Sequence, residues 1–91
     1  MTLVVKRKGR KESFDEKKLY ASIFAACQEC GIENEKSEHI SEKIVHELAI
    51  HLKGRHEVNS TEIFGFVTER LARMNEAVAF MYETHRDLVR S

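Results

Sequence analysis

The chain has 91 residues, of which 15 are Lys or Arg and 15 are Asp or Glu, so its formal net charge at neutral pH is zero. A chain of this length forms one domain with a small core, which argues against a self-contained enzyme with a deep substrate cleft. The zero net charge argues against a protein held to nucleic acid by bulk electrostatics. The sequence has no proline and only four glycines, a composition that favours long helices.

The cysteine content and the hydropathy indicate a cytoplasmic protein. Cys27 and Cys30 form a single close pair, which is not a disulfide framework, so we expect a reducing compartment. The longest uncharged run, residues 19–28, is about half the length that a membrane span requires. The basic N-terminal residues have no apolar run behind them, so the pattern of a signal peptide is not seen.

The N-terminal residues predict a β-hairpin. Residues 3–5 are β-prone and begin a strand that runs into Lys6 and Arg7. Gly9 supplies the positive φ of a tight turn. Residues 10–14 then return as the second strand.

Two helices are expected after the hairpin. Asp15 stands where an N-cap belongs, directly before a helical pattern that Gly31 ends. The second helix begins between residues 34 and 37 and ends at Gly54. Spacings of three and four residues define two apolar faces: Leu19, Ile23, Ala26, Cys27 and Cys30 in the first helix, and Ile40, Ile44, Val45, Leu48, Ala49 and Leu52 in the second.

The last third of the chain predicts two more helices. Residues 56–59 fit either a third strand or a loop. Ser60 is the expected N-cap of the third helix, and Asn75 is the expected break before the fourth. The inward faces are expected to hold Ile63, Phe66, Val67, Leu71 and Met74 in the third helix, and Val78, Met81, Tyr82, His85, Leu88 and Val89 in the fourth.

These elements together predict the fold. Four helices with short connections favour an antiparallel bundle. An isolated hairpin is not stable, so the hairpin must cover one end or face of the bundle. We therefore expect an α+β fold that is mainly α, a four-helix bundle capped by a small β-hairpin or a three-stranded sheet, in a single domain over residues 1–91.

The sequence offers no catalytic or metal-binding constellation. Cys27 and Cys30 fall on the apolar face of a helix, and no second pair completes a zinc site, so both thiols are expected to pack in the core. A thiol in such surroundings is a poor nucleophile. Neither a nucleophile elbow nor a glycine-rich phosphate loop occurs. We therefore expect neither an enzyme nor a metal protein.

Basic residues concentrate at the N-terminal end. Residues 1–18 carry seven basic and three acidic side chains, whereas residues 29–62 carry four basic and eight acidic ones. Such an uneven distribution on a neutral chain indicates a local anion site, although a charge run also fits a plain solvated face.

The hairpin and the start of the first helix form the best candidate for this anion site. The N-terminus of a helix attracts anions, and Lys18 lies in the first turn, near Lys6 and Arg7 from the strand. Glu12 and Asp15 can accept hydrogen bonds from an amino group. Cations for phosphate beside acceptors for an exocyclic amine suit a purine nucleotide.

The order of residues from Val4 to Ile23 resembles the beginning of an ATP-cone domain. It reads Val-Val-Lys-Arg-Lys-Gly-Arg-x-Glu-x-Phe-Asp-x-x-Lys-Leu-x-x-Ser-Ile. Residues 58–63, Val-Asn-Ser-Thr-Glu-Ile, resemble the family's strand that leads into the third helix. Residues 77–86 resemble its last helix, so the resemblance spans roughly residues 3–90.

The resemblance implies a fold and a regulatory function. ATP-cones are four-helix units capped by a three-stranded sheet, which would make residues 56–59 the third strand. They bind ATP or dATP as regulators without hydrolysis. They occur in ribonucleotide reductase catalytic subunits, in a zinc-ribbon repressor of reductase genes and in some 2-phosphoglycerate kinases.

The implied ligand is ATP or dATP, with or without Mg²⁺, and it would shift an oligomeric or partner-bound state linked to reductase activity or expression. The implied partners are a second copy, a reductase or a transcriptional regulator, and no membrane.

The resemblance also assigns candidate nucleotide-binding residues by position. It places phosphate contacts at Lys6, Arg7 and Lys18. Adenine contacts would come from the strand backbone near Val4, from Glu12 and from Asp15. The set is completed by a hydroxyl at the start of the third helix, a side chain one turn further on and a basic residue in the last helix, namely Ser60, Phe64 and Arg86.

Three positions depart from the family pattern. Phe64 stands where some reductase cones have a polar residue, often His, and Phe cannot hydrogen-bond a ribose or a phosphate. Lys8 stands where Asp or Asn often precedes the turn glycine. Asp87 follows Arg86 where a second basic residue is sometimes found. The sequence leaves the choice between ATP and dATP open, and it fits both a stand-alone domain and a part of a larger protein.

Two other interpretations compete with nucleotide sensing. In a nucleotide-independent interaction or oligomerisation module, Lys6, Arg7 and Lys18 would be solvated charges and an exposed apolar helix face would carry the function. Direct nucleic-acid binding by the basic hairpin is weaker still, because acidic residues lie among the basic ones. We expect no direct nucleic-acid partner.

Overall fold

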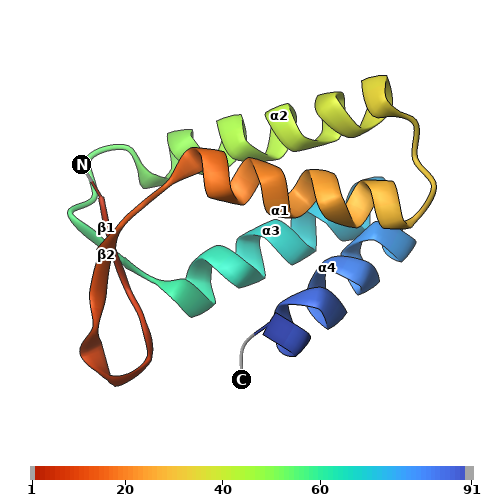
Figure 1. The fold of residues 1–91 in the computed structure, drawn as a ribbon. Coiled ribbons are helices and arrows are strands. Elements are labelled where there is room, and N and C mark those ends of the chain that lie inside the picture. Colours follow the sequence, from red (N-terminus) through yellow and green to blue (C-terminus); the bar gives the residue numbers. More distant parts are fainter. Residues whose placement is uncertain (1, 90–91) are drawn as a thin grey trace.

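The computed structural model describes residues 2–89, and the surroundings of side chains as far as Thr84. It confirms the α+β class, with four helices and a three-stranded sheet (Figure 1). In chain order the elements are β1 (Leu3–Val5), a short 3₁₀ turn (Arg7–Gly9), β2 (Lys11–Ser13), α1 (Glu16–Glu29), α2 (Asn34–Leu52), β3 (Glu57–Asn59), α3 (Ser60–Met74) and α4 (Glu76–Val89).

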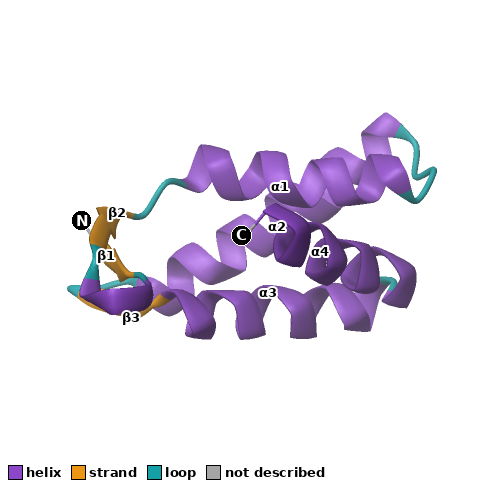
Figure 2. Ribbon diagram, turned by 60° about the horizontal axis from the view of Figure 1, so that its bottom comes forward, coloured by secondary structure: helices purple, strands orange, loops and turns teal. Residues whose placement is uncertain are grey.

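The sheet lies at one end of the helical bundle (Figure 2). Its strand order is β2-β1-β3, with β1 antiparallel to β2 and parallel to β3. Val4 stands opposite Glu12 on one side and Val58 on the other. Val4 and Val58 are both buried, so their side chains attach the sheet to the bundle. Residues 57–59 are therefore a strand, which settles the choice between strand and loop.

The hairpin strands are shorter than predicted. The strand expected to run through Arg7 ends at Val5, and the return strand covers only residues 11–13. Lys8 and Gly9 both adopt positive φ, at 67° and 79°. Two consecutive residues in this left-handed region reverse the chain within the segment that was expected to be extended. Arg7 consequently belongs to the turn and not to the strand.

One predicted helix cap is confirmed and another is wrong. Asp15 Oδ1 accepts hydrogen bonds from the backbone N–H groups of Lys17 and Lys18, at 3.0 and 3.2 Å. Ser60 is not an N-cap, since β3 runs directly into α3 and Ser60 is already the first helical residue. Asn59 occupies the cap position and its side chain makes no capping bond.

The break between α3 and α4 falls at Asn75, as predicted. Its side chain caps α4, because Asn75 Oδ1 accepts from the Val78 N–H at 3.2 Å. Met74 was expected to point inward, but it is 37% exposed. It is the last residue of α3, directly before the break at Asn75.

The core runs along the inner faces of the four helices. Its fully buried members include Ile23, Ile44, Leu48, Leu71 and Val78. The α2 helix also buries Ser37 and Ser41, which the apolar pattern did not predict. Their hydroxyls donate to the carbonyls of residues 32 and 37, so these polar groups are satisfied inside the core.

The cysteines are free thiols and belong to the core side of α1. Cys27 is fully buried and Cys30 half-buried. Burial raises the pKa of the Cys27 thiol above its usual range, which makes it less reactive. The predicted packing role of Cys27 is confirmed. Across the described residues, none of the helices combines the length and the apolar character needed to cross a bilayer.

Candidate functional site

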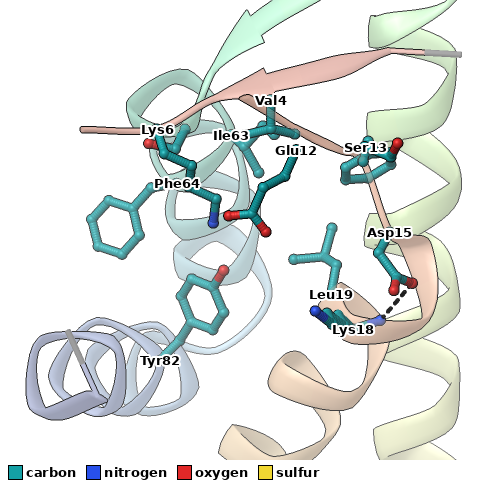
Figure 3. Close-up of a pocket in the computed structure, with 12 residues that line it drawn as sticks. Val4, Lys6, Glu12, Ser13, Asp15, Lys18, Leu19, Ile63, Phe64 and Tyr82 are labelled. Carbon is teal, nitrogen blue, oxygen red and sulfur yellow. Dashed lines mark hydrogen bonds between the residues drawn. The ribbon is translucent and has the colours of Figure 1, made fainter. Parts of the chain in front are cut away.

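A pocket of about 320 Å³ lies between the sheet and the helices (Figure 3). The sheet forms one wall, the first turn of α1 another, and the facing sides of α3 and α4 close the rest. The residues that line it are Val4, Lys6, Glu12, Ser13, Phe14, Asp15, Lys18, Leu19, Ser60, Ile63, Phe64 and Tyr82.

Two lysines from different elements reach this pocket. Lys6 follows β1 directly, and Lys18 lies in the first turn of α1. Asp15 fixes that first turn, because its carboxylate accepts from the N–H groups of residues 17 and 18. These two helix N–H groups are therefore already satisfied by the cap. An anion in the pocket would be attracted mainly by the two ammonium groups.

Glu12 brings a carboxylate into the same space. It is half-buried on β2, and in Figure 3 its carboxylate points toward the region between Lys6 and Tyr82. Its Oε2 lies 3.1 Å from Arg10 Nη2 in an ion pair that is largely exposed. Exposed ion pairs contribute little free energy, so Glu12 can exchange this partner for a ligand donor at small cost.

Two aromatic rings form the apolar wall of the pocket. Phe64 from α3 and Tyr82 from α4 stack with ring centroids 5.9 Å apart. Tyr82 is 9% exposed, and its hydroxyl points into the pocket in Figure 3. Phe66, two residues after Phe64, lies outside the pocket against His51. Of the two neighbouring phenylalanines, the one in the pocket is thus Phe64.

The structure brings most of the predicted site residues together. The candidates that line the pocket are Val4, Lys6, Glu12, Asp15, Lys18, Ser60 and Phe64. Arg7 does not line it, because the chain reverses at this residue and leaves it exposed in the turn. The side chain of Arg86 lies outside the described residues.

Sequence reasoning missed several lining residues, namely Ser13, Phe14, Leu19, Ile63 and Tyr82. Leu19, Ile63 and Tyr82 were interpreted as core positions from their helical spacing. These residues do lie on the core-facing sides of their helices, and the same sides also line the pocket. The closeness of Tyr82 to the hairpin has no local sequence signal. Within the described part of the chain, no group of three or more His, Cys, Asp or Glu side chains could hold a metal ion.

The fold and the pocket define a class of protein: a small four-helix domain whose sheet closes one end over a pocket of mixed charge. The chain matches the ATP cone domain over residues 2–90 and belongs to this family. The resemblance seen in the sequence is thereby confirmed. Family membership argues against the alternative of a nucleotide-independent interaction module.

Three curated relatives that match the chain carry the same name. "Transcriptional repressor NrdR" from Prochlorococcus marinus (strain MIT 9303) is 37% identical over 75 residues, covering 80% of this chain and 45% of the relative. The protein of that name from Carboxydothermus hydrogenoformans is 34% identical over 90 residues, covering 94% and 57%. That from Dictyoglomus thermophilum is 38% identical over 79 residues, covering 87% and 51%. The chain thus spans about half the length of these relatives.

Proposed function

We propose that this chain binds an adenine nucleotide, ATP or dATP, as a regulatory ligand that it does not hydrolyse. The observation that carries the proposal is the convergence of Lys6 and Lys18 on a single pocket that Glu12 also faces. The two ammonium groups suit the phosphates. The carboxylate suits an exocyclic amino group, which it can bind as an acceptor.

The family supports the choice of nucleotide. Glu12 can accept a hydrogen bond from the 6-amino group of adenine, whereas guanine has a carbonyl oxygen at that position. Asp15 adds a second carboxylate at the start of α1, although its Oδ1 is engaged by the helix cap. Glu12 is therefore the pocket carboxylate that is more readily available to a base amino group.

The ligand would act by shifting a population. A nucleotide that binds two assembly states with different affinity moves the equilibrium between them. The names of the relatives support a transcriptional regulator as the setting. They lend no support to the sequence-based expectation that no nucleic-acid partner is involved. The link to ribonucleotide reductase activity or expression follows from the family resemblance.

Calorimetric titration with ATP, dATP and GTP, each with and without Mg²⁺, tests the proposal. We expect micromolar binding of the adenine nucleotides and little heat with GTP. The double variant Lys6→Ala/Lys18→Ala should lose the binding. A matched control is Lys17→Ala/Lys43→Ala, which removes the same charge from two exposed lysines outside the pocket.

Two results would contradict the proposal. One is a folded wild-type chain that shows neither heat nor thermal stabilisation with any nucleotide. The other is equal loss of binding in the pocket variant and in the control variant, since that would indicate a diffuse effect of net charge and no defined site.

A further inference from the structure

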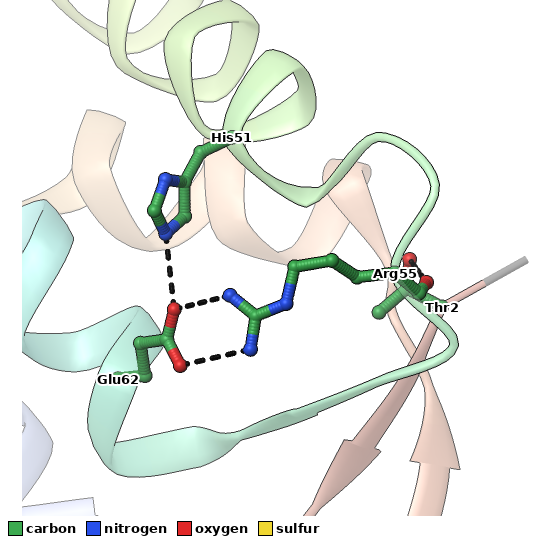
Figure 4. Close-up of polar contacts among 4 residues, drawn as sticks. All are labelled: Thr2, His51, Arg55 and Glu62. Carbon is green, nitrogen blue, oxygen red and sulfur yellow. Dashed lines mark hydrogen bonds and ion pairs between the residues drawn. The ribbon is translucent and has the colours of Figure 1, made fainter.

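A polar cluster lies at the start of α3, outside the pocket (Figure 4). Glu62 accepts hydrogen bonds from both terminal nitrogens of Arg55, and the Nη2–Oε1 distance is 3.0 Å. His51 Nε2 lies 3.0 Å from Glu62 Oε2. The cluster therefore joins the end of α2, the α2–β3 connection and the first turn of α3.

The backbone carbonyls of Arg55 and His56 are bonded to the chain at the beginning of β1. The Arg55 carbonyl accepts from the Thr2 hydroxyl at 2.9 Å. The carbonyl of His56 accepts from the Leu3 N–H at 2.8 Å. One short segment thus contacts the beginning of β1 through its backbone and α3 through the Arg55 side chain.

We propose that Arg55 and Glu62 are positioning residues that set how α3 stands relative to the sheet, and thereby set the affinity of the pocket for its ligand. The inference rests on the nucleotide site proposed above. The hairpin contributes Lys6, directly after β1, and Glu12 on β2 to the pocket, and α3 contributes Ser60 and Phe64. Glu62 lies between Ser60 and Phe64 at the start of α3, so a shift of this part of the helix moves both.

The geometry of the pair suits this role better than a role in stability. A two-point contact between a guanidinium and a carboxylate fixes orientation as well as distance. The side chains of Arg55 and Glu62 are each 38% exposed, and ion pairs this accessible contribute little to the free energy of unfolding. A contact that fixes α3 relative to the sheet before the ligand binds lowers the conformational entropy that is lost on binding. The effect should therefore appear in ligand affinity.

The test compares this pair with a second ion pair on the same helix. Glu69 and Arg73, 2.8 Å apart, are exposed and lie outside the pocket. Glu62→Gln and Arg55→Lys each disrupt the two-point contact, and Glu69→Gln and Arg73→Lys are their matched controls. Calorimetric titration with ATP should show affinity falling about fivefold in each member of the first pair and unchanged affinity in the controls.

A double variant adds a readout that general destabilisation does not reproduce. If both residues act through one contact, Glu62→Gln/Arg55→Lys should be no weaker than either single variant. Wild-type affinity in folded Glu62→Gln protein would overturn the proposal. The proposal would also be overturned if the affinity losses of the two single variants added up in the double variant.

Amide hydrogen exchange of the unliganded protein separates this proposal from the nucleotide site itself. Exchange at Leu3 and over residues 63–66, the first amides of α3 with intrahelical acceptors, should be faster in Glu62→Gln than in Glu69→Gln. If the wild-type protein binds no nucleotide but Glu62→Gln still exchanges faster, the proposed ligand is overturned and the coupling of sheet and helix is kept. Unchanged exchange would overturn the coupling.

Discussion

The ring of Phe64 on α3 stacks on the ring of Tyr82 on α4, with centroids 5.9 Å and planes 22° apart. Aromatic pairs of this kind add about 0.5–1.5 kcal/mol beyond the burial of their area. The pair joins the two helices at the wall of the pocket that faces the two lysines. This wall offers a flat apolar surface at Phe64 and a hydroxyl at Tyr82.

Replacing Phe64 should change the discrimination between ATP and dATP. An imidazole can hydrogen-bond the ribose 2′-hydroxyl, which ATP has and dATP lacks, whereas a phenyl ring cannot. We expect Phe64→His to increase the ratio of dATP to ATP dissociation constants by about three- to tenfold, the equivalent of one added hydrogen bond. Calorimetry with both nucleotides measures the ratio. Phe66→His is the control, since Phe66 lies outside the pocket, and an equal change there would contradict the assignment.

Removing the α1 cap should destabilise the domain. Asp15 satisfies two backbone N–H groups at the start of α1, and loss of such a cap costs about 1 kcal/mol. Asp15→Ala should lower the free energy of unfolding in urea by this amount. Asp15→Asn keeps an acceptor oxygen and should lose much less. Equal losses in the two variants would show that the negative charge, and not the cap bond, stabilises the helix.

Core truncation should separate buried from exposed positions on α2. Ile44 is fully buried, whereas Ile50, on the same helix, is 60% exposed. Ile44→Ala should lower the free energy of unfolding by about 2–5 kcal/mol, the range for a buried aliphatic side chain. Ile50→Ala should stay within about 0.5 kcal/mol of wild type. A large loss at Ile50 would indicate that this face packs against something in the folded protein.

Glu62 should add a modest pH dependence to stability in the acid range, modest because its side chain is 38% exposed to solvent. Hydrogen bonds from Arg55 and then from His51 lower the pKa of its carboxyl from 4.5 to about 2. The unfolded chain therefore binds more protons than the folded chain between these values, and stability rises with pH there. The contribution is fully present above about pH 4.5 and is lost as the pH falls toward 2.

Urea unfolding between pH 2 and 5 measures this slope. The slope should be smaller in Glu62→Gln, which has no titrating carboxyl at this position. Glu69→Gln serves as the control for loss of a surface charge. An identical slope in wild type and Glu62→Gln would show that the carboxyl is not held ionised by the cluster.

Local sequence patterns were sufficient to predict the helices and the part of the site that lies in the hairpin and the first turn of α1. Asp15 as a cap, Gly9 in the turn and the apolar stripes of α1 and α2 depend on neighbours within a few residues. Lys6, Glu12 and Lys18 were found for the same reason, because they lie within one short stretch of hairpin and first helical turn. Arg7 was misplaced, since a turn with two positive φ values has no clear signal when one of its residues is Lys8.

The residues that the second half of the chain contributes to the pocket depend on tertiary packing. Spacing along each helix was enough to predict which of its faces is apolar. It did not determine which faces meet. Packing of α4 against α1 and α3 brings Tyr82 and Phe64 together beside residues near the N-terminus, and the chain passes through β3 so that Glu62 meets Arg55. These contacts join residues from separate elements, and only the packed bundle determines how those elements meet.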